Sequence, residues 1–191
     1  MDVIRAIETR QSIGRVKPDP VPKELIERIL ESAVHAPNHR LTEPWRFHVF
    51  MGKGRGELAR ARAEIARLQA EAEGESEELA AGRISRERKK AFRAPVVIAV
   101  ICEAGRDEIE TLENYAACAC AVQNMQLTAH SLGLAAMWRT GPIAYHEHMR
   151  RFFGLREGDT VVAHLYVGYP DMAERPRRRR PAKELTLWHE G

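Results

Sequence analysis

Apolar residues along this chain follow two spacings, one typical of helices and one typical of strands. Apolar positions three and four residues apart predict helices over 2–10, from Pro22 to Pro37, over 112–132 and over 145–153. A longer helical region is predicted over 57–93. Gly74 and Gly82 are expected to interrupt it, because glycine weakens a helix interior.

The strands are predicted from alternating or continuous runs of apolar and β-branched residues, over 45–51, 95–102, 134–138 and 160–169. The run over 95–102 is apolar on both faces, so we expect a central strand that is buried on both sides. Helices enclose three or four strands without a regular βαβ alternation, and this order favours a single α+β domain.

The composition is that of a globular protein. The chain has 191 residues, of which 44% are hydrophobic and 30% are charged. These values exclude a disordered chain, and no apolar run approaches the ~20 residues that cross a bilayer. Three cysteines and an acidic, amphipathic start in place of an export signal predict a cytoplasmic protein with no membrane partner.

Charge is concentrated near the end of the chain. The formal net charge is +3, and residues 172–183 hold six basic residues and one acid, which is +5. The rest therefore carries 3 − 5 = −2. A slightly acidic body makes nucleic acid an unlikely partner for the fold as a whole.

Three motifs are explained more simply by local structure than by a role in metal or cofactor binding. Cys118 and Cys120 stand two apart on a predicted helix, where they point to different faces, so we interpret them as packing residues and predict no metal site. The segment 146–148, His-Glu-His, has the same spacing, and we interpret it as a solvated helix face instead of a metal site. The segment 52–56, GKGRG, lacks the third glycine of a dinucleotide fingerprint and is predicted to be an ordinary strand-to-helix turn.

Three polar clusters are more suggestive. The segment 10–15, RQSIGR, joins two guanidinium groups to a hydroxyl, which suits a phosphate but also suits a helix end. The segment 35–39, HAPNH, is a donor-rich loop or a simple helix stop. The segment 138–141, WRTG, ends a predicted strand, where a cofactor pocket can form or where side chains merely pack.

Taken in order, these motifs resemble the FMN-dependent nitroreductase family, in its short, minimal branch of small NAD(P)H nitroreductases. The resemblance covers 2–170 and rests on 10–12, 36–39, 44–47, 93–95, 138–141 and 166–170, with the small-residue helix around Met125. It implies a three-layer sandwich with a central, mainly antiparallel sheet flanked by helices, in an intertwined homodimer with FMN sites at the interface. It also implies an FMN-binding domain over 1–170 and a basic tail over 171–191 that is extended or embraces the partner.

The resemblance also implies roles for individual residues. The residues that would hold FMN are Arg10, Gln11, Ser12, His35, His39, Trp138, Arg139 and Thr140. Those that would bind NAD(P) are Thr128, Ala129, His130, Ser131, Leu132 and Gly133. Arg10 to Ser12 would hold the ribityl phosphate end, and the two histidines would come from either subunit. Gln11 departs from the family, in which a second arginine is usual.

The implied activity needs no catalytic side chain, because FMN supplies the hydride chemistry. NAD(P)H would reduce FMN, and a nitroaromatic or quinone-like acceptor would then take two electrons in the same slot, which predicts ping-pong kinetics. Two alternatives stay open. The same fold could serve another flavin reaction (dehalogenation, substrate oxidation or flavin reduction), or Arg175 and 177–180 could bind an anionic partner on a non-enzymatic domain.

Overall fold

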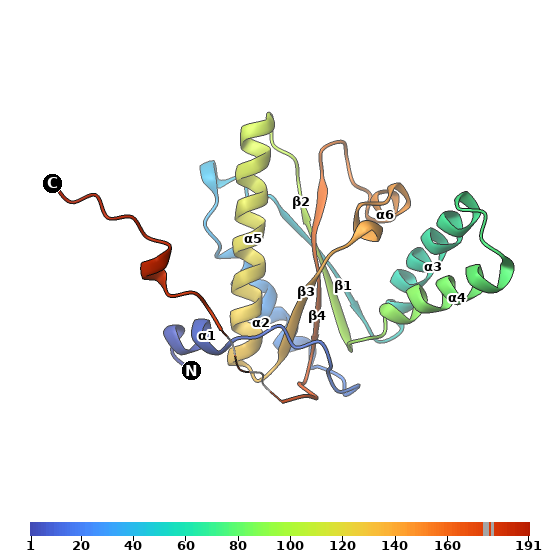
Figure 1. The fold of residues 1–191 in the computed structure, drawn as a ribbon, viewed down its shortest axis with the longest axis horizontal. Coiled ribbons are helices and arrows are strands. Elements are labelled where there is room, and N and C mark those ends of the chain that lie inside the picture. Colours follow the sequence, from blue (N-terminus) through green and yellow to red (C-terminus); the bar gives the residue numbers. More distant parts are fainter. Residues whose placement is uncertain (174–175, 177) are drawn as a thin grey trace.

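An antiparallel sheet lies in the middle of the molecule (Figure 1). The computed structural model describes residues 1–173, 176 and 178–191. These residues form β1 (Trp45–Met51), β2 (Val96–Cys102), β3 (Ala135–Arg139) and β4 (Thr160–Gly168), in the order β1-β2-β4-β3. Each neighbouring pair is antiparallel, as the family resemblance implied.

The two central strands are buried because nearly all of their side chains are apolar on both faces. Every residue of β2 is buried, and so is every residue of β4 except Thr160. Complete burial of one valine or isoleucine side chain stabilises the fold by about 1.5–3 kcal/mol. The prediction of a central strand over 95–102 is confirmed.

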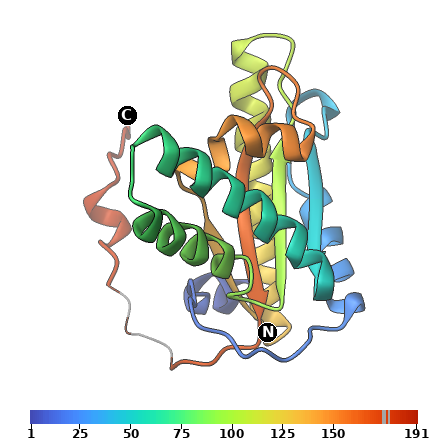
Figure 2. The ribbon, with the colours of Figure 1, turned by 90° about the vertical axis from the view of Figure 1, so that its right-hand side faces the viewer.

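Helices cover both faces of the sheet, which makes three layers (Figures 1 and 2). One face carries α1 (Val3–Thr9), α2 (Lys23–Val34) and α5 (Glu108–Ser131). The other carries α3 (Arg55–Ala72), α4 (Glu77–Lys90) and α6 (Glu147–Phe153). Short 3-10 turns span His39–Leu41, Gly52–Gly54, Pro142–Tyr145 and Ala182–Glu184. The predicted three-layer α+β sandwich is confirmed.

Two predicted helix boundaries are wrong. The helical region over 57–93 breaks only once, at Gly74, which has a positive φ of 65°, and Ser76 then caps α4. Gly82 lies inside α4, where its missing side chain costs only about 1 kcal/mol. Helix α5 begins at Glu108, not at 112, because the Asp107 side chain accepts a hydrogen bond from the backbone of Glu110 and caps an exposed, polar first turn.

After β4 the chain returns to the segment that follows α1. The amide of Lys17 donates to the carbonyl of Tyr169 at 2.8 Å, and the amide of Asp171 donates to the carbonyl of Arg15 at 3.1 Å. Residues 178–191 then run outward from the body and are exposed (Figure 1). Arg175 and Arg177, which the sequence placed in the basic tail, lie outside the described residues. Within the described ranges, no helix is long and apolar enough to cross a membrane.

Candidate functional site

The segment after α1 lies against strand β3. Ser12 forms a parallel bridge with Ala136, which fixes its backbone at the edge of the sheet. A side chain added at Gly14 would place its Cβ 3.3 Å from Sδ of Met137 and 3.6 Å from Nη2 of Arg139. Two of the predicted cofactor clusters, around Ser12 and around Arg139, are therefore neighbours in space.

Arg10 joins this neighbourhood from the end of α1. Its Nη1 donates to Oε1 of Gln126 in α5 at 3.2 Å, where Arg10 is partly buried and Gln126 is buried. This contact holds the guanidinium group beside the segment that carries Gln11 and Ser12. A planar guanidinium group has the geometry for a bidentate contact to a phosphate.

A cavity of about 640 Å³ opens over this segment. Residues 11–15, Met137, Met172 and Ala173 line it. Arg15, one of these lining residues, donates from its Nε to the carbonyl of Asp171 at 2.7 Å. The volume lies in the range of small-molecule sites. The guanidinium and hydroxyl groups of this segment would hold the phosphate of FMN, and its flat ring would lie against strand β3. The residues present are therefore compatible with FMN.

The three residues at the end of β3 differ in their surroundings. The indole N–H of Trp138 donates to the carbonyl of Val162 at 2.9 Å, and the ring packs against the core on the α5 face. The guanidinium of Arg139 lies 5.7 Å from the centre of the Tyr166 ring, which is a cation–π distance. Thr140 is exposed and lines a second cavity. Only Arg139 joins the Ser12 neighbourhood directly.

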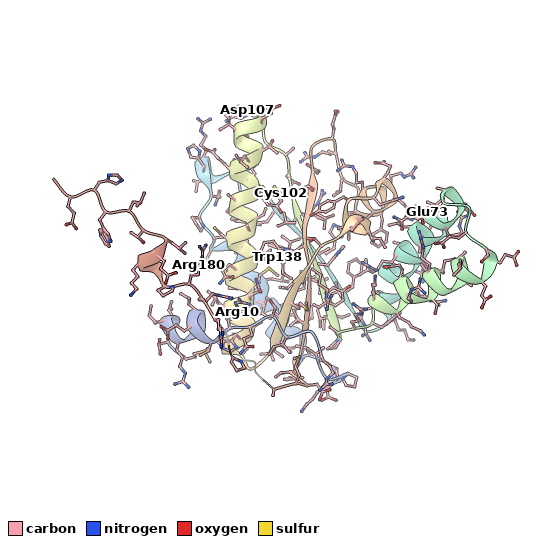
Figure 3. The ribbon with its side chains drawn as sticks, viewed as in Figure 1. Arg10, Glu73, Cys102, Asp107, Trp138 and Arg180 are labelled. Atoms are coloured by element: carbon pink, nitrogen blue, oxygen red, sulfur yellow. The ribbon has the colours of Figure 1, made fainter. Side chains whose placement is uncertain are left out.

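The two histidines lie elsewhere in the chain. His35 ends α2 and is 3.6 Å from Oε1 of Glu31, and Nδ1 of His39 is 2.6 Å from Oε2 of Glu113. Glu113 and Gln126 are both on α5, and thirteen residues of helix span about 20 Å. Figure 3 shows Arg10 at one end of this helix and its Asp107 cap at the other. A single chain therefore does not bring His39 and Arg10 together.

The segment predicted to bind NAD(P), 128–133, forms the last turn of α5 and the turn that follows. Nε2 of His130 is 2.8 Å from Oγ1 of Thr9, and Oγ of Ser131 donates to the carbonyl of Thr128 at 2.9 Å. A helix C-terminus presents carbonyl groups and a partial negative charge, which favours cations over phosphates. The helix end therefore adds no electrostatic attraction for a dinucleotide.

The simpler motifs behave largely as expected. The segment 52–56 makes a 3-10 turn that leads directly into α3, so the predicted strand-to-helix turn is confirmed. Cys118 is buried, but Cys120 is exposed, so the prediction that both pack is wrong for Cys120. Nδ1 of His146 accepts the amide of His148 at 3.1 Å, which makes it a helix cap.

The sequence interpretation missed His164, a histidine within the apolar run of β4. It is 2% exposed, and its Nε2 has no hydrogen-bond partner in the described part of the chain. Burial, and then the positive charge of Arg62, lower the pKa of His164 to about 4. The sequence offered one signal for it, namely a single histidine within the predicted strand of mostly apolar residues over 160–169. It marks the second cavity, which Thr140 also lines.

Comparison with known proteins relates this geometry to one family. The family model described as "Nitroreductase family" matches residues 7–169. The chain is 31% identical over 184 residues to "Putative NAD(P)H nitroreductase YfhC" of Bacillus subtilis, covering 96% of this chain and 90% of that protein. It is also 31% identical over 179 residues to "Putative NAD(P)H nitroreductase YdjA" of Escherichia coli, covering 90% of each.

Two solved structures extend the comparison. A nitroreductase-like family protein from Bacillus cereus superimposes with a TM-score of 0.87 at 29% identity, covering 100% of this chain and 97% of that one. A structure from Desulfovibrio desulfuricans, titled a putative nitroreductase in complex with FMN, gives a TM-score of 0.71 at 27% identity. That alignment covers 100% of this chain and 98% of the other.

Proposed function

This chain belongs to the nitroreductase family, and from that premise we propose that it is an FMN-dependent oxidoreductase. NAD(P)H would be the hydride donor, and a nitroaromatic or quinone-like compound would be the acceptor of two electrons. The observation that carries the proposal is the cavity of about 640 Å³ that Ser12 and Gly14 line. Arg10 directly precedes this segment and is held by Gln126, and Arg139 lies beside Gly14. The names of the relatives and the FMN complex of one of them support it.

In the proposed site the arginine side chains would bind the negative charge of FMN, and the backbone would set the shape of the pocket. Arg10 and the hydroxyl of Ser12 would bind the phosphate of FMN, with Gln11 as a neutral neighbour. Gly14 leaves room for a flat ring, since a side chain there would crowd Met137. Arg139, fixed over the Tyr166 ring, would stabilise negative charge that develops during hydride transfer. FMN, when bound, supplies the redox chemistry.

We propose that a second copy of the chain completes the site. His39 lies far from Arg10 within one chain, so it would line the cofactor of the partner, and His35 would line the cofactor from either subunit. Large apolar side chains are exposed on α1 and α5 and suit such an interface: Val3, Ile4, Ile7, Ile109 and Leu112. Residues 1–170 would form the cofactor-binding domain. The tail over 171–191 would embrace the second copy, and the exposed side chains of Leu187 and Trp188 would be buried against it.

The reaction would follow a ping-pong order, because NAD(P)H and the acceptor would use one slot in turn. The residues of this chain would bind and orient both substrates and exclude water, and no side chain is required as acid, base or nucleophile. The segment 128–133 stays a prediction for dinucleotide binding. Dependence on NAD(P)H implies the cytoplasm, where this donor is supplied.

The proposal is tested on the purified, full-length protein. We expect a flavin absorption spectrum, release of about one FMN per chain on denaturation, and oxidation of NADH or NADPH when a nitroaromatic compound or a quinone is added. Turnover of a flavin substrate without NAD(P)H would favour the alternative flavin reactions. A protein that shows no flavin spectrum after FMN is supplied, and that oxidises neither nicotinamide donor with any acceptor, would contradict it.

A further inference from the structure

A smaller cavity, of about 320 Å³, lies beside the chain that follows the proposed FMN site. Three stretches meet around it: residues 16–18, Arg55 at the start of α3, and residues 92–95 between α4 and β2. None of these residues lines the cavity over 11–15, so the two cavities have separate walls. We call the smaller one the Lys17 cavity.

Close backbone packing fixes the walls of the Lys17 cavity. The amide of Lys17 donates to the carbonyl of Tyr169 at 2.8 Å, just beyond the end of β4. Gly168 permits this approach, because a Cβ there would lie 2.8 Å from Cδ of Pro95 and 2.9 Å from Cγ2 of Val16. The two segments are thus held against each other before any ligand binds, so that binding would require little further ordering.

Arg55 is fixed in this wall with part of its guanidinium group free. Its Nη1 donates to the carbonyl of Ala94 at 2.8 Å, and its Nε donates to the carbonyl of Gly52 at 3.3 Å. The group also lies 5.4 Å from the centre of the Phe92 ring, which is a cation–π distance. Its Nη2 has no partner among the described residues and is not enclosed, so it stays open to solvent. Arg55 therefore keeps an accessible donor in a side chain whose orientation is already set.

The charge around the Lys17 cavity is entirely positive. Lys17, Arg55 and Arg93 line it, and no acidic residue does. Within the described ranges, none of these three side chains forms an ion pair. By contrast, Arg15 lies 3.4 Å from a carboxylate oxygen of Asp171. Like charges gathered around one opening repel one another, and an anion bound among them would replace that repulsion with attraction.

A phosphate group fits this wall better than a carboxylate group does. A phosphate monoester carries nearly two negative charges at neutral pH and has three strong acceptor oxygens, whereas a carboxylate has one charge and two oxygens. Guanidinium and ammonium groups form their strongest hydrogen bonds with such anionic oxygens. The rest of the lining is apolar, and Phe92 is 48% exposed, which leaves a surface for a small apolar body attached to the phosphate.

We propose that the Lys17 cavity binds a phosphate group, with Lys17 and Arg93 as its charge partners and Arg55 as the oriented donor. Two sources share this chemistry: inorganic phosphate, and the phosphate of a small monoester whose apolar body lies on Phe92. The site is separate from the one proposed for FMN. The inference therefore does not rest on the proposed function.

Binding is measured by calorimetric titration of the full-length protein, which is first supplied with FMN and then freed of the excess. Inorganic phosphate and phenyl phosphate are the two phosphate probes, and benzoate is the carboxylate probe. We expect saturable binding of both phosphates at low ionic strength, and weaker binding as salt screens the three cations. Benzoate should bind at least about tenfold more weakly than phenyl phosphate, because it makes fewer charge-assisted contacts.

Lys17→Met and Arg93→Met remove one charge each and keep most of the side-chain length. We expect each to weaken phenyl phosphate by about tenfold, because one charge-assisted contact is lost. Lys53→Met is the matched control, since Lys53 is exposed on the turn before Arg55 and does not line the cavity. It should change the affinity by less than about twofold. Unchanged thermal unfolding midpoints would show that the variants are folded, and their FMN content should stay that of the unaltered protein.

The two phosphate probes separate the sources of the ligand. Tighter binding of phenyl phosphate assigns the site to a monoester, and equal or tighter binding of inorganic phosphate assigns it to the free anion; either supports the inference.

Four results would overturn it: neither phosphate binds saturably, benzoate binds as tightly, the cavity variants bind phosphate no more weakly than Lys53→Met, or they lose FMN together with phosphate. The last result would make the cavity part of the FMN site. Normal NAD(P)H oxidation without phosphate binding would overturn this inference alone. Phosphate binding through Lys17 in a protein that neither holds FMN nor oxidises NAD(P)H would leave the inference standing and contradict the proposed function.

Discussion

Replacing Arg10 with methionine is expected to lower the affinity for FMN by about 10- to 100-fold. Methionine keeps most of the length of the side chain but removes the charged donors. Arg10 is held by Gln126 beside Ser12, so its loss takes away the cation that would contact the phosphate. The measurement is a titration of flavin-free protein with FMN, followed by the quenching of flavin fluorescence.

Arg5→Met is the matched control for this result. Arg5 is on the same short helix and is exposed, and its backbone amide, which the substitution keeps, donates to Asp2. We expect its affinity for FMN to stay near that of the unaltered protein. Riboflavin, which lacks the phosphate, should bind the Arg10 variant and the unaltered protein equally. If Arg10→Met weakens riboflavin as much as FMN, Arg10 does not serve the phosphate.

Acid is expected to destabilise the protein through His164. Burial and Arg62 lower its pKa from 6.5 to about 4 in the folded state. Between these values the unfolded chain binds a proton that the folded chain does not, so stability falls as the pH falls from 6.5 to 4. From pH 7 to pH 5 this group alone should remove about 2 kcal/mol from the free energy of unfolding. Below about pH 4 both states are protonated, and the loss from this group ends.

Urea unfolding at pH 7 and pH 5 measures the effect, at a fixed protein concentration. Other groups also titrate in this range, so the informative quantity is the difference between the unaltered protein and His164→Gln. The variant lacks the titrating ring and should lose about 2 kcal/mol less between the two pH values. An equal loss in both proteins would show that His164 is not held neutral by burial.

Local patterns predicted the elements well where burial dictates them. Strands β1 and β2 fall where alternating and continuous apolar runs placed them, because a strand inside the sheet needs those side chains. The start of α5 was missed because residues 108–111 are mostly polar and exposed, and a cap at Asp107 holds that turn. Gly82 did not break α4, since no local signal distinguishes a tolerated glycine from a terminating one.

The candidate site was harder to predict, because it depends on contacts between residues far apart in the chain. Ser12 and Arg139 meet only because the segment after α1 pairs with β3. His39 was grouped with them through the family resemblance, but the single chain places it beside Glu113, toward the other end of α5. His164 could not be told from a packed core histidine until the cavity beside it was known.

The proposed FMN site takes Arg10 from one chain and His39 from another, and a mixing experiment tests this directly. Arg10→Met and His39→Leu proteins are prepared flavin-free, mixed so that subunits exchange, and supplied with FMN at a concentration where neither variant alone binds it. Random exchange gives mixed dimers in which one of two sites has both residues, so roughly a quarter of all sites should regain FMN. If the mixture binds no more FMN than the separate variants, the two residues do not belong to one site shared between chains.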